Sequence, residues 1–426
     1  MPRSFVRDDC AVLQRKKLLS AEELRAWGPV LRGDGCVDAA AMDALRRRVR
    51  ELFEQELDTL IDATRVRQNA THQQTLQPTD LVAVAAGGLL GALNAWMRPA
   101  PVGPVARPSA AAPSSARARA PAPATSLWAS AFDAAQASLN VVRQRRLLDH
   151  LRIRHLSGDE DSSADVLLCV NGFMTQGGDP LHNWRHWAPS DARVVQYAVL
   201  WEAGDVDVWN EFCAHANENI KTSAAHELLT HFSGNPWHKA QDKAEQVGIV
   251  LAHVLAARPT FCRGRRITLL GHSLGAAVIY SLLNELAAIR RRDGPCVDMS
   301  LTLDGPVVTN ALCFAGAFVP SVEGLAQMAH ELAPGGVLVN VFSQRDDVLS
   351  KLFWATQLHT RDAVAAGCAP LDWSASRVSN GVNVDVSDVV PPRMTNQFGH
   401  SYAPHMQAIR ARVLPHLPPY LSSPPQ

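Results

Sequence analysis

The sequence predicts an α/β fold with a mostly parallel sheet, preceded by a helical N-terminal region. Three observations lead to this prediction. Short apolar runs typical of buried strands recur in the second half of the chain, longer helical stretches separate them, and a Pro/Ala-rich segment sets them apart from the N-terminal helices. The 426 residues are enough for one large domain and a smaller region.

Composition limits the kinds of partner and cofactor that we expect. The 41 basic and 41 acidic side chains balance, so nothing in the net charge favours a nucleic acid partner. The eight cysteines form no C-x-x-C pair and are typical of reduced thiols, and the first residues lack the apolar segment of a signal peptide, so we expect a cytoplasmic protein. We expect no cofactor and no metal, because His182 with His186 and His226 with His231 do not match the zinc pattern H-E-x-x-H.

Residues 1–98 read as a helical N-terminal region. Ser20 precedes Glu23 by three positions, which is a capping-box pattern, and an amphipathic run follows from 37 to 70. Residues 81–97 carry no charge, although they are rich in Ala and Gly and fall short of the roughly 20 apolar residues of a typical span. Two interpretations of 81–97 stay open: a buried packing helix and a membrane-contacting helix.

Residues 99–125 are dominated by Pro and Ala, which predicts a linker before a second domain over 126–426. This domain should begin with a helix over about 126–151. Repeated βαβ units should follow, because buried-strand runs alternate with helical patterns. The expected strands are 166–170, 194–201, 267–270, 311–319 and 337–342, and the expected helices include 240–257, 274–291 and 322–332.

The G-x-S-x-G sequence at 271–275 stands directly between the strand 267–270 and the helix that follows. This context is that of a nucleophile elbow, in which a serine sits at the apex of a strained strand-to-helix turn between two glycines. We therefore expect Ser273 to be a nucleophile. The N–H of Leu274, at the start of the helix, is the expected first donor to an oxyanion.

An acidic residue should lie beyond the serine, in a loop after a later strand. Asp346 follows the strand 337–342 and is the preferred candidate. Asp347 is its immediate neighbour and rival. Asp304 could enter from an earlier strand.

A histidine should follow the acid as the general base. His400 lies in a loop before the last expected helix, 54 residues after Asp346, and is the preferred candidate. His405 and His416 fall within or after that helix and are less suitable. The second oxyanion donor should come from the loop after an early strand, where 171–173 read Asn-Gly-Phe, so we expect it to be the N–H of Phe173.

Several longer motifs resemble one family. They are VNGFMTQG (170–177), LWEAG (200–204), ITLLGHSLGAAVIY (267–280), VNVFSQRDDVL (339–349), NVDVSDVV (383–390) and GHSYAP (399–404). Residues 165–410 are similar to the transmembrane-and-coiled-coil-domain-4-like α/β-hydrolases, also known as domain of unknown function 726. The resemblance implies an α/β-hydrolase fold, catalytic positions at Ser273, Asp346 and His400, and membrane association. Members of that family often carry an aromatic residue where Asp347 stands.

The expected function is therefore that of a serine esterase or lipase-like hydrolase, which cleaves carboxylic esters through an acyl-enzyme. Lipid esters are the expected substrates and a membrane surface a candidate partner. The segment 203–240, with Trp209, Phe212, Phe232 and Trp237, is expected to form either a helical cap over the site or a structural insertion. Two other functions stay open: an inactive membrane-associated binding or scaffold protein with a hydrolase fold, and an acyltransferase that uses the same triad.

Overall fold

The computed structural model describes most of the chain, and the account below concerns only the described residues. These are 5–32, 39–74, 84–85, 87–89, 127–159, 165–187, 194–208, 236–292, 303, 305–353 and 364–418. The contacts divide the chain into two units. The first comprises residues 1–71, 148–215 and 236–426, and the second comprises 72–147 and 216–235.

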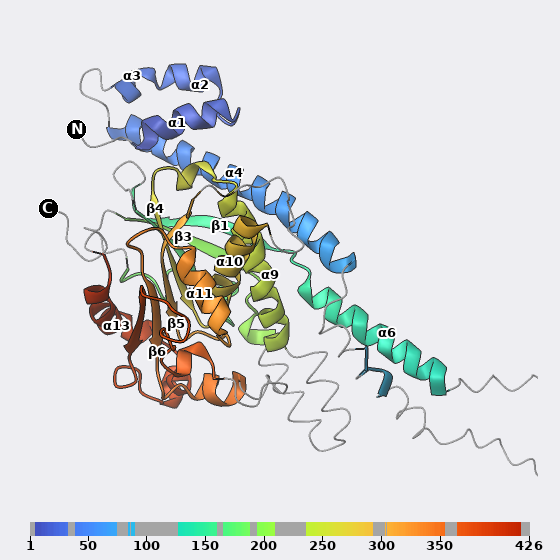
Figure 1. Cartoon of the computed structure of the whole chain (residues 1–426). Helices are drawn as coiled ribbons and strands as arrows, with labels where there is room; N and C mark the ends of the chain where they lie inside the picture. Colours follow the sequence, from blue (N-terminus) through green and yellow to red (C-terminus); the bar gives the residue numbers. More distant parts are fainter. Residues whose placement is uncertain are drawn as a thin grey trace, which may run out of the picture. The chain divides into compact units, whose positions relative to one another are not determined.

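A seven-stranded sheet forms the centre of the first unit, in the order β1-β3-β2-β4-β5-β6-β7 (Figure 1). Only β1 runs antiparallel to its neighbour, β3, and the other neighbouring strands are parallel. This strand order is that of the α/β-hydrolase fold, so the predicted fold class is confirmed. The strands are β1 Leu151–Ser157, β2 Asp165–Val170, β3 Val194–Trp201, β4 Arg266–His272, β5 Val308–Phe314, β6 Leu338–Phe342 and β7 Gly381–Asp385.

The five inner strands match the runs expected from the sequence, with shifted ends. The main difference is β5, which ends at Phe314, five residues before the expected end at 319. The two edge strands, β1 and β7, were not expected. Leu151 and Ile153 alternate with partly exposed arginines, which is the pattern of an edge strand, whereas β7 buries only Val384 fully.

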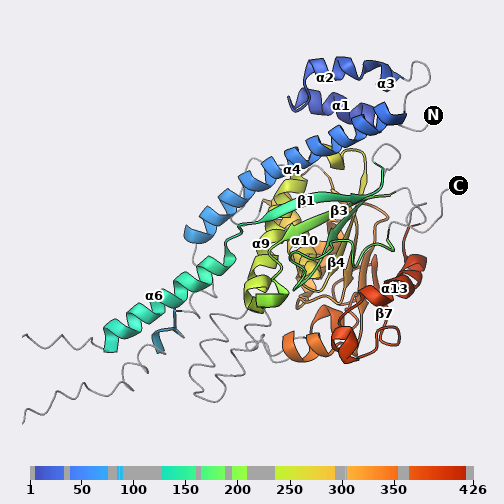
Figure 2. The ribbon, with the colours of Figure 1, turned by 180° about the vertical axis from the view of Figure 1, so that it is seen from behind.

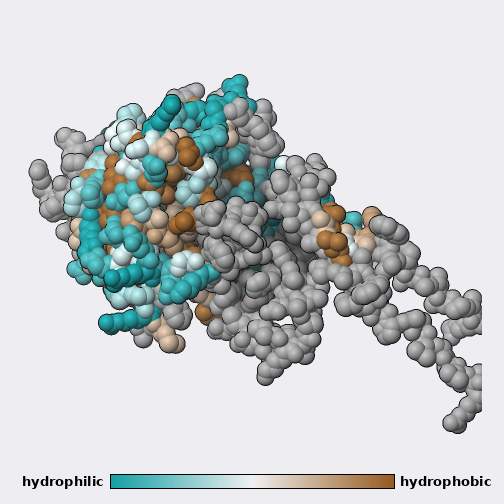
Figure 3. Space-filling model, turned by 60° about the horizontal axis from the view of Figure 1, so that its bottom comes forward, coloured by the Kyte–Doolittle hydropathy of each residue, from teal (hydrophilic) through white to brown (hydrophobic). Residues whose placement is uncertain are grey.

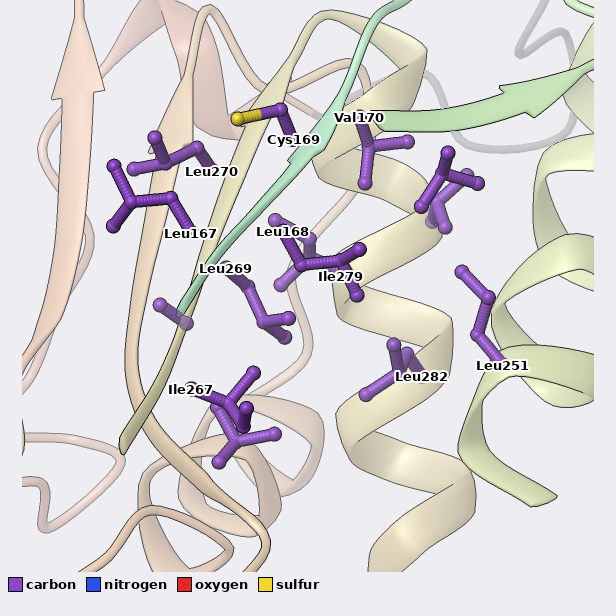
Figure 4. Close-up of a cluster of buried hydrophobic side chains, with 14 of the residues drawn as sticks. Leu167, Leu168, Cys169, Val170, Leu251, Ile267, Leu269, Leu270, Ile279 and Leu282 are labelled. Carbon is purple, nitrogen blue, oxygen red and sulfur yellow. The ribbon is translucent and has the colours of Figure 1, made fainter. Parts of the chain in front are cut away.

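Helices α9 (Pro236–Ala256) and α10 (Leu274–Arg291) run side by side against the sheet. A Cβ at Gly248 of α9 would lie 2.6 Å from the carbonyl oxygen of Val278 in α10, so the glycine lets the two helices approach closely. Leu168 and Leu269 of the strands meet Ile279 of α10 in the core that Figure 4 shows. Burial of this apolar surface fixes α10, and thereby the residue that precedes it. Helices α11 (Val322–His330) and α13 (Met406–Val413) follow β5 and β7.

The N-terminal helices belong to the same unit as the sheet. They are α1 (Phe5–Arg15), α2 (Ala21–Ala26), α3 (Gly28–Arg32) and α4 (Ala39–Gln74). The capping box at α2 is present: Ser20 Oγ accepts from Glu23 N at 3.1 Å, and Glu23 accepts from Ser20 N at 3.0 Å. Apolar residues of α1 and α4 are buried in the core that also contains the strands, and these helices fall in the same unit as the sheet up to Thr71.

A cluster of buried charges attaches these helices to the turn before β4, and we call it the N-terminal clamp: Asp9, Lys16, Glu56, Thr260 and Arg265. Arg265 donates to Asp9 at 2.7 Å, and both side chains are nearly inaccessible to solvent. Glu56 accepts from the backbone N–H of Thr260 at 2.9 Å and also binds Lys16. Burial raises the pKa of Asp9 from 3.8 to about 6, because the loss of solvation outweighs the stabilising charge of Arg265.

Helix α4 also covers the edge strand β1 (Figure 2). Carboxylates spaced one turn apart on α4 bind the guanidinium groups of Arg152 and Arg154. Glu54 of the same helix accepts from the backbone N–H of His155 at 3.0 Å, so part of the strand edge has its partner on α4. The ion pairs are Arg152–Asp62 at 3.0 Å and Arg154–Asp58 at 2.8 Å.

In the second unit the structure describes chiefly α6 (Leu127–Arg146), which ends five residues before the expected position. Gly87 packs directly against Ser138 of this helix, where a Cβ would lie 2.3 Å from the hydroxyl oxygen. Most of the segment 81–97 and all of the linker 99–125 lie outside the described residues. Within the described part of the chain, the search for a helix with the length and apolar character of a membrane span found none.

Candidate active site

Ser273 occupies a strained turn between β4 and α10, as a nucleophile elbow requires. Its backbone has φ 56° and ψ −120°, a conformation that non-glycine residues rarely adopt. A Cβ at Gly271 would lie 2.5 Å from the carbonyl oxygen of Gly275, and one at Gly275 would lie 2.1 Å from that of Val170. Both flanking positions therefore need glycine, and the turn holds the serine at the carboxyl edge of the sheet.

Three sequence-predicted residues meet in one hydrogen-bonded chain at this edge. His400 Nε2 lies 2.8 Å from Ser273 Oγ, and His400 Nδ1 lies 2.7 Å from Asp346 Oδ2. An ionised carboxylate only accepts, so Nδ1 carries the proton and Nε2 is left to accept from the serine hydroxyl. The exposed fractions of Ser273, His400 and Asp346 are 2%, 7% and 0%, so their contacts are shielded from water.

The acid is held at both oxygens. While Oδ2 of Asp346 faces His400, its Oδ1 accepts from the backbone N–H of Leu349 at 2.9 Å. The rival Asp347 is partly exposed and pairs instead with Lys351 at 2.9 Å. The preferred candidate Asp346 thus faces His400, whereas its neighbour Asp347 faces Lys351, and Asp304 lies outside the described residues.

The loop that carries the base packs tightly onto the loop that carries the acid. Gly399, directly before His400, has φ 87°, and a Cβ there would lie 2.4 Å from the carbonyl oxygen of Arg345. A glycine at this position therefore lets the two loops touch. His405 and His416 lie in the later turns Ala403–His405 and Leu414–His416 and are not part of the hydrogen-bonded chain.

The two expected oxyanion donors lie on neighbouring segments. Gly172 packs against the turn, since a Cβ there would lie 2.6 Å from Ser273 Cβ and 3.1 Å from Leu274 N. Phe173 follows Gly172 directly. The N–H of Leu274 is at the first position of α10, where a helix offers no acceptor of its own. The dipole of α10 also favours negative charge at this end.

The loop after β2 is braced by polar contacts. The side-chain amide of Asn171 donates to the carbonyl oxygen of Pro180 at 3.0 Å, and its carbonyl accepts from Asn183 at 2.9 Å. The ring of Phe173 packs edge-on against Trp237 of α9, with 5.1 Å between the ring centroids. This bracing limits the reorganisation that would be needed when charge develops beside Ser273.

His272 is a residue of the site that sequence reasoning missed. Its Nε2–H donates to the backbone carbonyl oxygen of His400 at 3.1 Å. Burial, with a smaller contribution from the proximity of His400, lowers the pKa of His272 from 6.5 to about 3, so the ring is neutral near pH 7. No spacing in the sequence indicates this contact, because it joins a side chain to a backbone atom 128 residues away.

Other parts of the expected site can be placed only in part. Within the described ranges, no group of three or more His, Cys, Asp and Glu side chains is arranged to hold a metal ion. Of the expected cap 203–240, residues 209–235 lie outside the described residues, including Trp209, Phe212 and Phe232. Trp237 is described and is buried against Phe173.

Comparison with known proteins gives matches over parts of the chain. The model of the family "Protein of unknown function (DUF726)" matches residues 225–409. The "Transmembrane and coiled-coil domain-containing protein STS1" of Oryza sativa is 27% identical over 248 residues, which is 53% of this chain and 33% of the relative. "Probable lipase MIL1" of Saccharomyces cerevisiae is 34% identical over 137 residues, or 32% of this chain and 11% of the relative.

Among solved structures, a lipase-esterase related protein from Clostridium acetobutylicum matches 63% of this chain and 100% of its own, with 11% identity and a TM-score of 0.24. The chain spans a third or less of the length of the two curated relatives named above. The family that the sequence motifs resemble is the one whose model matches, so that resemblance is confirmed over residues 225–409.

Proposed function

We propose that the protein is a serine hydrolase that cleaves carboxylic esters. The hydroxyl oxygen of Ser273 attacks the acyl carbonyl while His400 Nε2 takes its proton, which forms a tetrahedral oxyanion. Asp346 stabilises the imidazolium that results. The N–H groups of Leu274 and Phe173 bind the oxyanion.

Collapse of this intermediate breaks the ester C–O bond, and His400 returns the proton to the departing alkoxide. The acyl group is then bonded to Ser273. A water molecule attacks the acyl-enzyme, gives its proton to His400, and releases the carboxylic acid as the serine recovers its hydrogen. An acyltransferase would use an alcohol in place of water at this second step.

One observation carries the proposal: the buried contact of His400 with Ser273 at 2.8 Å and with Asp346 at 2.7 Å. A buried histidine with a structural role needs hydrogen-bond partners for its two ring nitrogens, but these partners need not include a hydroxyl placed for reaction. Here its second nitrogen points at a hydroxyl on a strained turn, beside a helix N-terminus. The combination matches the nucleophile, base and orienting acid of acyl transfer.

Lipid esters are the proposed substrates. Exposed apolar side chains lie on segments that follow strands β3, β5, β6 and β7 along the chain: Val206, Val208, Val322, Val364 and Met394. Apolar residues are also exposed among hydrophilic ones on the face that Figure 3 shows. One relative is named as a lipase, and another is named as a transmembrane protein.

We also propose that the protein works in the cytoplasm at a membrane surface. The segment 203–240 would cover the site.

A fluorophosphonate probe tests the proposed chemistry. Ser273 should displace fluoride from the probe, and labelling should disappear in Ser273→Ala while the variant unfolds at the temperature of the wild type. Tyr280→Phe, which removes a partly buried hydroxyl of α10 that contacts Ser321 rather than the three site residues, is a control that should label normally. Labelling that persists in Ser273→Ala would reject the nucleophile, and failure of the folded wild type to label would favour an inactive scaffold.

The substrate class is tested with esters of increasing chain length and with phospholipid and triacylglycerol vesicles. We expect hydrolysis to rise with chain length and to release free acid. Product analysis with added alcohol separates hydrolysis from acyl transfer. Equal rates on short soluble esters and on vesicles would count against a lipid substrate.

A further inference from the structure

We propose that His272 is a positioning residue that holds the backbone of the general base His400 against the strand that carries the nucleophile. The inference rests on the proposed function, because it assigns a task to a neighbour of the three reacting residues. His272 touches no reacting atom. It acts through His400.

The geometry carries this inference. His272 is the last residue of β4, and Ser273 follows it directly. Its Nε2–H donates to His400 O at 3.1 Å, and the two rings lie 5.3 Å apart between centroids. Strand β4 therefore supplies the group that holds the base and leads directly into the turn that carries the nucleophile. Adjacent residues of the chain thus help to set the distance between Ser273 Oγ and His400 Nε2.

The backbone of His400 is held from two sides. On the side of the nucleophile, it accepts the hydrogen bond from His272. On the side of the acid, Gly399 lies against the carbonyl of Arg345, next to Asp346. Without His272 the loop would lose its hydrogen bond on the side of the nucleophile. His400 would then be held by the contact of Gly399 with Arg345 and by its own hydrogen bond to Asp346, and the loop could move away from the serine.

The surroundings of His272 favour the neutral ring with its proton on Nε2, which the hydrogen bond to the His400 carbonyl oxygen requires. A carbonyl oxygen only accepts, so Nε2 must carry the proton. The groups that face the ring are His400, His182 and the ring of Tyr402, whose centroid lies 5.4 Å away, and Asp346 lies beyond His400. Because burial lowers the pKa of His272 to about 3, the ring places no positive charge beside His400 when that residue takes a proton during the reaction.

Two variants separate positioning from packing. His272→Phe keeps an aromatic ring but has no donor, whereas His272→Gln offers an amide N–H at about the position of Nε2. Each is compared with the wild type in the rate constant for fluorophosphonate labelling, in kcat and KM for p-nitrophenyl butyrate between pH 6 and 9, and in thermal unfolding.

We expect His272→Phe to lower the labelling constant and kcat by about tenfold, with KM unchanged, and His272→Gln to stay within about twofold of the wild type. A merely structural role would lower the unfolding temperature and leave kcat per folded molecule unchanged. The inference is overturned if the Phe variant reacts at the wild-type rate or if the Gln variant is as slow as the Phe variant.

A measurement that does not depend on catalysis keeps this test distinct from the test of the proposed function. Nitrogen chemical shifts of labelled histidines should show His272 as the neutral Nε2–H tautomer from pH 5 to 9, and the His400 signals should change in the Phe variant but not in the Gln variant. Titration of His272 within that range would overturn the inference even if no variant were active. A wild type that is never labelled would reject only the hydrolase chemistry.

Discussion

Two clusters of buried charge serve different ends in this molecule. In the N-terminal clamp, the Asp9 carboxylate faces the guanidinium group of Arg265. At the candidate active site, the Asp346 carboxylate faces the imidazole ring of His400. Both pairs lie at 2.7 Å and are largely buried. Burial and pairing alone thus do not mark a reactive site.

The two pairs differ in the further contacts of the basic side chains, Arg265 and His400. Arg265 also donates a hydrogen bond to the backbone carbonyl oxygen of Phe261, at 3.1 Å. His400 continues to a hydroxyl on a strained turn. Changes in the clamp should therefore alter stability and leave chemistry intact, whereas changes at the site should do the reverse.

The largest effect is expected from Asp346→Asn. The amide would favour the wrong tautomer of His400, and kcat for ester hydrolysis should fall by about 10⁴-fold. The unfolding temperature should move little, because the amide oxygen can still accept from Leu349. Asp347→Asn is the matched control and should keep wild-type kinetics; a similar loss in both variants would mean that the acid was wrongly assigned.

Asp9→Ala should have the next largest effect, on stability. It leaves Arg265 buried without its carboxylate, which costs about 3–5 kcal/mol of unfolding free energy. Chemical denaturation measures the loss, and labelling of Ser273 per folded molecule should not change. The double variant Asp9→Leu with Arg265→Met should recover most of the stability. Slower labelling in folded Asp9→Ala would contradict the separation of the two regions.

Gly172→Ala should show a smaller effect that falls mainly on chemistry. The new methyl group would lie 2.6 Å from both Ser273 Cβ and the carbonyl of His272, so the loop with the second oxyanion donor must shift. We expect kcat to fall by about 10²-fold, comparable with the loss of one oxyanion donor. Gly178→Ala, where a Cβ would meet only ordinary contacts, is the control. Equal kinetics in the two variants would argue against Phe173 as a donor.

The smallest expected effect is the pH dependence of the clamp. Because the pKa of Asp9 is raised from 3.8 to about 6, the folded protein binds the proton more tightly than the unfolded chain does. Its contribution to stability is full below pH 3.8 and is lost as the pH rises through 6. Between pH 7 and 5 the wild type should gain about 1.4 kcal/mol relative to Asp9→Asn. A parallel pH dependence in both proteins would contradict the raised pKa.

The inner part of the fold could be predicted from the sequence because its signals are local. A strand buried on both faces reads as a continuous apolar run, so β2 and β4 were found, and the helix predicted over 274–291 has the bounds of α10. Ser273 stood out because the turn needs glycine on both sides. The order of acid and base along the chain then led to Asp346 and His400.

The remaining features depend on contacts between distant residues. The sequence favoured Asp346 but left Asp347 open as its rival, because only the direction of each side chain distinguishes two adjacent acids. His272 was missed for the same reason, since its partner is a backbone oxygen. The grouping of α1 and α4 with the sheet depends on Asp9 meeting Arg265 across 256 positions. Edge strand β7 was not expected, because it has only five residues and no continuous apolar run, although Val382 and Val384 alternate with polar residues.

The cover that α4 provides over β1 has a consequence for how the protein can be divided. An uncovered outer strand offers unpaired N–H and C=O groups to other molecules and promotes aggregation. The sequence alone would suggest cutting the chain near residue 126, which would remove α4 and leave Arg152 and Arg154 without their carboxylates. A soluble fragment that contains the sheet should therefore retain residues 39–71, so a helix outside the candidate active site decides whether the remainder can be isolated.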